Sequence, residues 1–348
     1  MKAWVLHGIN DLRFEETNTP VIGEKEVLLA VKAVGVCGSD IPRVFYTGTY
    51  SFPLIPGHEF AGQVVESGNG VDKNWQGQRV GVFPLIPCYD CPPCRAEKYE
   101  MCRHYSYLGS RCDGGFAEYV AVPEKNLIAL PEGVGFEEAA MLEPMSVAVH
   151  AMRKMALSEK DRIVICGLGT IGLFLLMFLR EAGHKNVLAI GNKEFQQQMA
   201  LKLGLPAESF CNSRTQDMER WLLERTDGEG ADVFFECVGR NETVMQAVGM
   251  TGPGGRIMLV GNPASDMTLS KPVYWKILRN QLTVFGTWNS SFTHSQEDDW
   301  HYVLEKLQGG RIAPAEMITH RLPLKELDKG FAIMRDKKEE YGKVMAGI

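Results

Sequence analysis

Residues 161–183 read "DRIVICGLGTIGLFLLMFLREAG": an apolar run, a glycine-rich turn and a second, longer apolar run. The first run has the length and β-branched content of a buried strand, and the second has the length of a helix. Gly167, Gly169 and Gly172 lie between them in a G-x-G-x-x-G pattern. In this setting the glycines permit a tight turn, the approach of a pyrophosphate to the helix N-terminus, and close packing of helix on strand. The stretch therefore predicts a dinucleotide-binding βαβ unit.

The chain around this unit repeats the alternation of strand and helix. A helix is predicted over 193–204, where Gly204 can end it. Further apolar strands are predicted over 186–191, 231–239, 255–261 and 281–288. Near-continuous apolar strands that alternate with helices are typical of a parallel sheet covered on both faces. We therefore expect an α/β Rossmann fold, a doubly wound parallel sheet, in residues 149–289.

The cofactor-binding residues are expected in the turns that follow these strands. They are Gly167, Leu168, Gly169, Thr170, Ile171, Gly172, Gly191, Asn192, Lys193, Cys237, Val260 and Thr287. An acid about 20 residues beyond the glycine turn normally binds the ribose 2′-hydroxyl, but Gly191, Asn192 and Lys193 stand there. The missing carboxylate removes repulsion against a 2′-phosphate and Lys193 adds attraction, which favours NADP. The alternative is NAD, with Glu194 or Asn192 on the hydroxyl.

The first part of the chain, up to about residue 145, has a different residue pattern. Short β-branched runs bounded by Gly and Pro occur at 26–36, 62–68, 77–85 and 116–123. Such runs read as short strands, and their number favours an all-β barrel or sandwich with long loops. A chain of 348 residues therefore divides into two domains of different class.

Composition excludes several kinds of partner. Lys and Arg number 37 against 43 Asp and Glu, a net charge of −6, and no basic run is present. This argues against nucleic acid and anionic membrane. The longest apolar run, 171–179, is far shorter than the ~20 residues that span a bilayer. With no signal-peptide pattern at the N-terminus, we expect a soluble, cytoplasmic protein.

The densest cysteine cluster is "PCYDCPPCRAEKYEMC", residues 87–102, which holds Cys88, Cys91, Cys94 and Cys102. In a reducing compartment such a cluster is more typical of metal binding than of disulfides. Four thiolates around one zinc leave no open position, so the sequence predicts a structural zinc site. An iron–sulfur cluster and a disulfide knot are the alternatives.

A second set of possible ligands is scattered. "GVCGSD" supplies Cys37 and Ser39, "PGHEFAG" supplies His58 and Glu59, and "MLEPMSVAVH" supplies Glu143. One thiolate, one imidazole and one or two carboxylates suit a zinc that keeps a position for water or substrate. Any one of them alone is more often a structural residue, so the spacing by itself leaves both interpretations open.

Together with "DGGFAEY", "EP" at 143–144 and "GLGTIG", these motifs resemble the zinc-dependent medium-chain dehydrogenase/reductases. "PLIPCYDCPPC", "YLGSRCDGGFAEY" and "KILRNQLTVFGTW" resemble the polyol dehydrogenase branch. The resemblance implies a GroES-like β-barrel catalytic domain made of residues 1–148 and 290–348, with a zinc lobe at about 86–104. The Rossmann domain, 149–289, is inserted between them. Two zincs per subunit and a homodimer or homotetramer are also implied.

The resemblance also implies roles for single residues. Cys37, His58 and Glu143 resemble catalytic zinc ligands, and Glu59 a fourth ligand or an exchanging neighbour. Ser39 resembles the hydroxyl that takes the substrate proton. The implied reaction moves a hydride between a secondary alcohol and a nicotinamide cofactor. Its substrate is a polyol or polyol phosphate, of the type that converts galactitol 1-phosphate to tagatose 6-phosphate.

A phosphorylated substrate needs cationic partners. Arg43, just after "CGSD", and Arg111, beside "DGG", are the candidates, with solvated surface arginines as the alternative. Other functions remain open at this point. They are oxidation of sorbitol or another polyol, oxidation of L-threonine, and a non-catalytic nucleotide-binding role.

Overall fold

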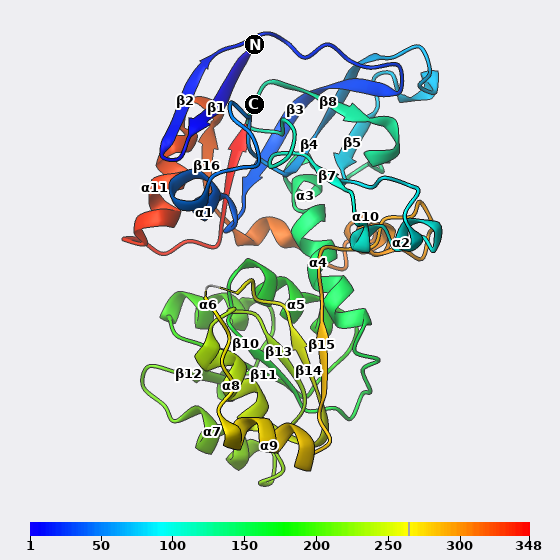
Figure 1. Ribbon diagram of the computed structural model, residues 1–348. Helices are drawn as coiled ribbons and strands as arrows, with labels where there is room; N and C mark the ends of the chain where they lie inside the picture. Colours follow the sequence, from blue (N-terminus) through cyan, green and yellow to red (C-terminus); the bar gives the residue numbers. More distant parts are fainter. Residues whose placement is uncertain (264) are drawn as a thin grey trace. The chain divides into compact units, whose positions relative to one another are not determined.

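The computed structural model describes residues 1–263 and 265–348 (Figure 1). The chain forms two compact units. The first contains Met1–Pro144 and Ser290–Ile348, so both ends of the chain belong to it, and the second is Met145–Asn289. The first boundary falls shortly before residue 148, within helix α4 (Leu142–Arg153).

A six-stranded sheet forms the centre of the second unit (Figure 1). All neighbouring strands in it are parallel. Their order is β12 (Phe210–Asn212), β11 (Val187–Gly191), β10 (Ile163–Cys166), β13 (Ala231–Glu236), β14 (Thr251–Leu259) and β15 (Thr283–Gly286). The order reverses direction at β10, as in doubly wound dinucleotide-binding sheets. The predicted α/β fold is confirmed.

Helices connect these strands. They are α5 (Thr170–Glu181), α6 (Glu194–Lys202), α7 (Met218–Arg225), α8 (Asn241–Met250) and α9 (Lys271–Arg279). Helix α5 is buried without interruption from Gly172 to Leu179, which explains its unusually apolar sequence. The glycine turn before it has the predicted form. Gly167 has φ +95°, and a Cβ on Gly172 would collide with the carbonyl oxygen of Gly167.

The first unit is built on a seven-stranded sheet. Strand β3 (Glu26–Val36) pairs with β4 (Glu59–Ser67), β8 (Tyr119–Pro123) and β17 (Lys343–Gly347). Strands β5 (Arg79–Val82) and β9 (Leu127–Ala129) extend one side, and β16 (Ile318–Pro323) extends the other. Two small sheets join β1 (Lys2–Gly8) to β2 (Asp11–Glu16) and β6 (Leu85–Ile86) to β7 (Ser106–Tyr107).

The remaining helices of this unit are short. They are α1 (Asp40–Pro42), a π turn (Arg43–Thr47), α2 (Pro92–Arg95), α3 (Phe136–Ala140), α10 (Asp299–Gln308) and α11 (Leu327–Asp336). The two ends of the chain share one core, in which the rings of Phe116 and Phe331 lie 5.6 Å apart. In the described part of the chain, no helix has the length and apolar character needed to cross a membrane.

Candidate metal centre and cofactor turn

Cys37, His58 and Glu59 meet at one edge of the first unit's sheet. Cys37 directly follows β3, and Glu59 opens β4. The antiparallel register pairs Gly35 with Glu59, so the end of β3 and the start of β4 coincide. Ligand atoms of these three residues lie within 4.8 Å of one another. The register of the sheet thus brings together donors that no single short stretch of the sequence contains.

A buried carboxylate, Asp40, organises this cluster. Its Oδ1 lies 3.4 Å from His58 Nδ1, and its Oδ2 accepts a hydrogen bond of 3.0 Å from the backbone N–H of Cys37. Burial alone would raise the pKa of Asp40, but the charges of His58 and Arg43 hold it below its ordinary value. A carboxylate beside one imidazole nitrogen orients a metal-binding histidine. With Nδ1 facing Asp40, the Nε2 atom of His58 is the one left for a metal.

Glu143 reaches the same cluster from the first turn of α4. The hydroxyl of Tyr107 donates to its Oε1 at 3.1 Å, and the Tyr107 ring lies 5.8 Å from that of His58. Burial raises the pKa of Glu143 to about 7, while the charge of His58 opposes this and that of Glu59 adds to it. Glu143 lies outside the 4.8 Å group, yet it belongs to the same electrostatic site.

Lys343 is the member of this site that sequence reasoning missed. It is 1% exposed. Its Nζ forms an ion pair with Glu59 Oε2 and donates to the carbonyl of Val36 at 3.1 Å. Burial alone would lower the pKa of Lys343, but the charges of Glu59 and Cys37 raise it. A Cβ on Gly35 would lie 2.5 Å from Glu59 Oε2 and 2.7 Å from Lys343 Cε, so this glycine leaves room for the pair.

Nothing near Lys343 in the sequence marks it as functional. It opens β17, which pairs with β3 so that Val344 faces Val36. This register alone brings the lysine to the end of β3. A lysine at the head of a C-terminal apolar strand normally reads as a solvated strand end, and only the sheet topology corrects that interpretation.

The donor chemistry of the cluster fits a zinc ion. Cys37, His58 and Glu143 offer one sulfur, one nitrogen and one oxygen, the kind of three-ligand set that leaves a position open for water or substrate. Glu59 already has a cation in Lys343. Ser39 stands beside the set, with its Oγ donating to Cys37 Sγ at 3.3 Å.

The four lobe cysteines also converge. Their sulfurs lie within 4.8 Å of one another, with 3.5 Å between those of Cys91 and Cys94. A hydrogen bond from the backbone N–H of Arg103, with others, lowers the pKa of Cys91 to about 6. All nine cysteines are free thiols in the described part of the chain, and the mutual approach of four sulfurs favours one metal ion over disulfides. The set fits one ion held by Cys88, Cys91, Cys94 and Cys102.

The predicted cofactor residues follow the carboxyl ends of the second unit's strands. Those at 167–172 follow β10, those at 191–193 end or follow β11, and Cys237, Val260 and Thr287 follow β13, β14 and β15. A Cβ on Gly169 would meet nothing within 4 Å, so the backbone at the start of α5 is open to an approaching group. This fits a pyrophosphate at the helix N-terminus.

The space beside Gly191 is already filled. A Cβ there would lie 2.8 Å from Gln196 Oε1 and 2.9 Å from Phe210 Cζ. Gln196 Oε1 also accepts a hydrogen bond of 2.9 Å from the backbone N–H of Asn192. An acidic side chain therefore cannot be added at position 191 without moving its neighbours.

Arg214 is a second basic residue near this turn, and sequence reasoning missed it. It lies just beyond β12, whose Asn212 is in register with Gly191, and Ser213 donates to the carbonyl of Gly191 at 2.8 Å. Arg214 is exposed. A basic residue that follows a strand, as in "NSRT", could have marked Arg214 as a candidate. Only the pairing of β12 with β11 shows that it lies near Gly191.

The two predicted substrate arginines have different surroundings. Arg43 Nη1 lies 2.5 Å from Asp40 Oδ1, and only 18% of its side chain is exposed. The guanidinium of Arg111 instead stacks on Tyr50 and Tyr105, with its carbon 3.9 Å and 4.4 Å from the ring centroids. Arg43 therefore supports the carboxylate behind His58, whereas Arg111 remains available for a ligand.

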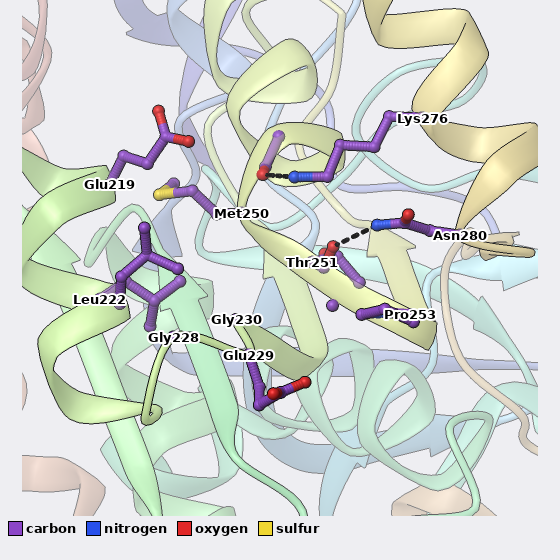
Figure 2. Close-up of a pocket in the computed structure, with 13 residues that line it drawn as sticks. Glu219, Leu222, Gly228, Glu229, Gly230, Met250, Thr251, Pro253, Lys276 and Asn280 are labelled. Atoms are coloured by element: carbon purple, nitrogen blue, oxygen red, sulfur yellow. Dashed lines mark hydrogen bonds between the residues drawn. The ribbon is translucent and has the colours of Figure 1, made fainter.

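A pocket of about 350 Å³ in the second unit lies at the opposite end of the sheet from the glycine turn, where β13 and β14 begin (Figure 2). Lys276 Nζ on its wall donates to the carbonyl of Gly249, and Asn280 Nδ2 lies 3.5 Å from the carbonyl of Thr251. Because backbone carbonyls already engage these polar groups, the pocket is a weaker ligand candidate than the glycine turn.

Two protein-family models match the chain. The alcohol dehydrogenase GroES-like domain matches residues 23–132, and the zinc-binding dehydrogenase model matches residues 170–309. Galactitol 1-phosphate 5-dehydrogenase of Escherichia coli (strain K12) is 34% identical over 92% of both chains. L-idonate 5-dehydrogenase of Vitis vinifera is 32% identical over 94% of this chain and 89% of the relative. L-threonine 3-dehydrogenase of Bacillus licheniformis is 32% identical over 95% and 94%.

Solved structures that resemble this chain are also named as dehydrogenases. The crystal structure of galactitol-1-phosphate dehydrogenase from Escherichia coli has a TM-score of 0.92 and 32% identity, and covers 100% of both chains. A Sinorhizobium meliloti 1021 protein bound to NADP has a TM-score of 0.90 and 26% identity. An Escherichia coli CFT073 alcohol dehydrogenase complexed with NADH has 0.90 and 27%. Each of the last two covers 100% of this chain and 99% of the relative.

Proposed function

Because the chain belongs to the zinc-dependent medium-chain alcohol and polyol dehydrogenases, we propose that it oxidises a secondary alcohol of a polyol phosphate, with a nicotinamide cofactor accepting the hydride. Galactitol 1-phosphate, oxidised to tagatose 6-phosphate, is the substrate type. The observation that supports this is the convergence of Cys37, His58 and Glu59 at one sheet edge beside Ser39, with Glu143 in electrostatic contact with them.

In this proposal Cys37, His58 and Glu143 hold the catalytic zinc. When bound, zinc supplies a Lewis acid that polarises the substrate oxygen. Ser39 takes the proton of the substrate hydroxyl and passes it toward solvent. Lys343 balances the charge of Glu59, so that this carboxylate stays beside the ligand set as an exchanging neighbour.

The remaining neighbours of the ligands position them. Asp40 fixes the ring of His58, and Arg43 fixes Asp40. Tyr107 orients Glu143 through the hydrogen bond to its Oε1. Each ligand other than Cys37 therefore has a buried or half-buried partner of its own, which keeps the set preorganised for the metal.

NADP is the proposed cofactor. Support comes from the filled space beside Gly191 and from Lys193 and Arg214 in the two adjoining turns, where a 2′-phosphate would sit. Arg214→Ala is expected to raise KM for NADP roughly 10-fold or more, with little change for NAD. Initial rates with both cofactors measure this. An equal effect on the two would point to a structural role, and a wild-type preference for NAD would overturn the NADP assignment.

A homodimer or homotetramer is proposed as well. Large apolar side chains are exposed on α9, on β15 and just after β15, and they include Tyr274, Trp275, Leu278, Val284 and Trp288. Apolar patches of this kind usually mark contacts between proteins. Light scattering of the purified protein tests the proposal, and a monomer at micromolar concentration would contradict it.

The deciding experiment for the reaction is a substrate screen with metal analysis. Galactitol 1-phosphate, sorbitol, ribitol 5-phosphate and L-threonine are tested with each cofactor, and the absorbance of reduced nicotinamide is followed. We expect two zinc ions per chain and activity with the polyol phosphates. Activity with L-threonine alone would overturn the polyol assignment. One zinc per chain without turnover would favour a non-catalytic relative.

A further inference from the structure

Arg111 is held in an unusual way for a half-exposed arginine. It lies in the loop between β7 and β8, where its backbone N–H donates to the carbonyl of Tyr107 at 2.8 Å. Its guanidinium stacks on Tyr105, just before β7, and on Tyr50 from the segment after the π turn. Stacking on aromatic faces holds an arginine in place without using its N–H donors.

In the described part of the chain, those donors have no protein partner. Among the residues that the structure describes, no carboxylate forms an ion pair with Arg111, and its guanidinium makes no side-chain hydrogen bond. Arg43, by contrast, is already paired with Asp40. A stacked arginine with a free edge is preorganised to bind an oxyanion through two parallel hydrogen bonds.

A continuous aromatic path connects Arg111 to the metal centre. The ring of Tyr105 lies 6.3 Å from that of Tyr107, and the hydroxyl of Tyr107 contacts Glu143. All of these residues belong to the first unit. Two tyrosine rings therefore link the guanidinium of Arg111 to a candidate zinc ligand of the same unit.

We propose that Arg111, stacked on Tyr50 and Tyr105, binds the phosphate of a polyol phosphate and selects it over neutral polyols. This inference rests on the proposed function and assigns the residue that recognises the phosphate of its substrate. A phosphate monoester carries about −1.5 to −2 charges at pH 7 and three acceptor oxygens, more than a carboxylate offers. Phosphate is therefore the anion that gains most from a free guanidinium, ahead of the carboxylate of a sugar acid.

The test compares galactitol 1-phosphate, galactitol and L-idonate on the zinc-loaded protein. Binding is measured by calorimetry without nicotinamide, and kcat and KM are measured with it. Arg111→Ala should weaken galactitol 1-phosphate roughly 10- to 100-fold, in Kd and KM rather than in kcat. The preference for galactitol 1-phosphate over galactitol should fall by the same factor. Arg13→Ala, an exposed arginine paired with Asp11, is the control and should change nothing.

Two further variants separate binding from folding. Tyr50→Ala removes the ring on which Arg111 stacks and should weaken galactitol 1-phosphate several-fold. Arg111→Lys keeps the charge but loses the paired donors, so its affinity should lie between those of Arg111→Ala and wild type. If Arg111→Ala fails to fold, these variants still decide, and an unchanged Kd in Tyr50→Ala and Arg111→Lys would overturn the proposal.

The outcomes distinguish this inference from the proposed reaction. If wild type oxidises galactitol 1-phosphate and Arg111→Ala has the same Kd and KM, the arginine assignment is wrong and the reaction stands. If wild type oxidises none of the polyols, the reaction is wrong, and the calorimetric arm still tests phosphate binding. Tighter binding of L-idonate than of galactitol 1-phosphate, lost in Arg111→Ala, would replace phosphate by carboxylate and overturn the stated class.

Discussion

The first unit contains two clusters of candidate metal ligands that are built in opposite ways. The lobe cluster takes its four cysteines from residues 88 to 102, within one loop. The sheet-edge cluster takes its members from the residue after β3, the start of β4 and the residue before it, the first turn of α4 and the start of β17, between residues 37 and 343. A loop can close on a metal through local spacing alone, whereas the second cluster exists only if the whole sheet is in register. Disruption of the lobe cluster should therefore mainly reduce stability, and disruption of the sheet-edge cluster should mainly reduce activity.

Removing a lobe ligand should give the largest change in stability. Cys91→Ser breaks a closed four-thiolate site, and structural zinc contributes on the order of 10 kcal/mol of folding free energy in small domains. We expect the loss of one zinc per chain and a clear fall in Tm, measured by metal analysis and thermal unfolding. Cys112→Ser, in the same region but outside the cluster, should retain both ions. An unchanged Tm with abolished hydride transfer would reverse the comparison of the two clusters.

Removing the charge of Lys343 should come next. Lys343→Met leaves Glu59 buried without its partner, a change that costs about 3–5 kcal/mol in comparable buried ion pairs. Denaturant unfolding should show this loss in zinc-free protein and a smaller loss with zinc bound, because the ion offers Glu59 a second cation.

The double variant Lys343→Met with Glu59→Gln is the control for this prediction. It removes both charges of the pair and should recover much of the lost stability. A double variant no more stable than the single one would mean that Lys343 acts through packing and not through its charge.

Substitution of Asp40 tests a residue that contacts the candidate ligand His58 without being a ligand itself. Asp40→Asn keeps the shape of the side chain but weakens its hold on His58, and such changes typically reduce zinc affinity about 10- to 100-fold. Competition with a zinc chelator measures this at the sheet-edge site, while the lobe site in the same molecule is the internal control. Equal weakening at both sites would show that the variant disturbs the whole unit.

The same contrast explains what could be read from the sequence. The glycine turn, the alternation of the second unit and the four-cysteine lobe all depend on short-range spacing, and the structure confirms the α/β class and the convergence of the cysteines. Cys37, His58, Glu59 and Glu143 became a set only through the resemblance to a family, because no local pattern joins them.

The site residues and contacts that could not be predicted from the sequence depend on which strands and segments pair. Lys343 acquires its place from the pairing of β17 with β3, and Arg214 from the pairing of β12 with β11. Arg43 and Arg111 look equivalent in the sequence, yet one lies against a buried carboxylate and the other against two tyrosines. Partners of this kind are contributed by distant segments, so no window along the chain contains them.

Tyr107→Phe should give the smallest effect, and it tests how much one hydrogen bond contributes to zinc affinity at the sheet-edge cluster. It removes one hydrogen bond to Glu143 but keeps the ring beside His58 and Tyr105. A buried hydrogen bond contributes about 0.5–1.5 kcal/mol, so zinc affinity at this site should fall only about 2- to 10-fold. Chelator competition measures it, with the lobe zinc again as internal reference. A loss as large as that of Asp40→Asn would mean that Tyr107, and not the helix position of Glu143, is what places this carboxylate at the metal.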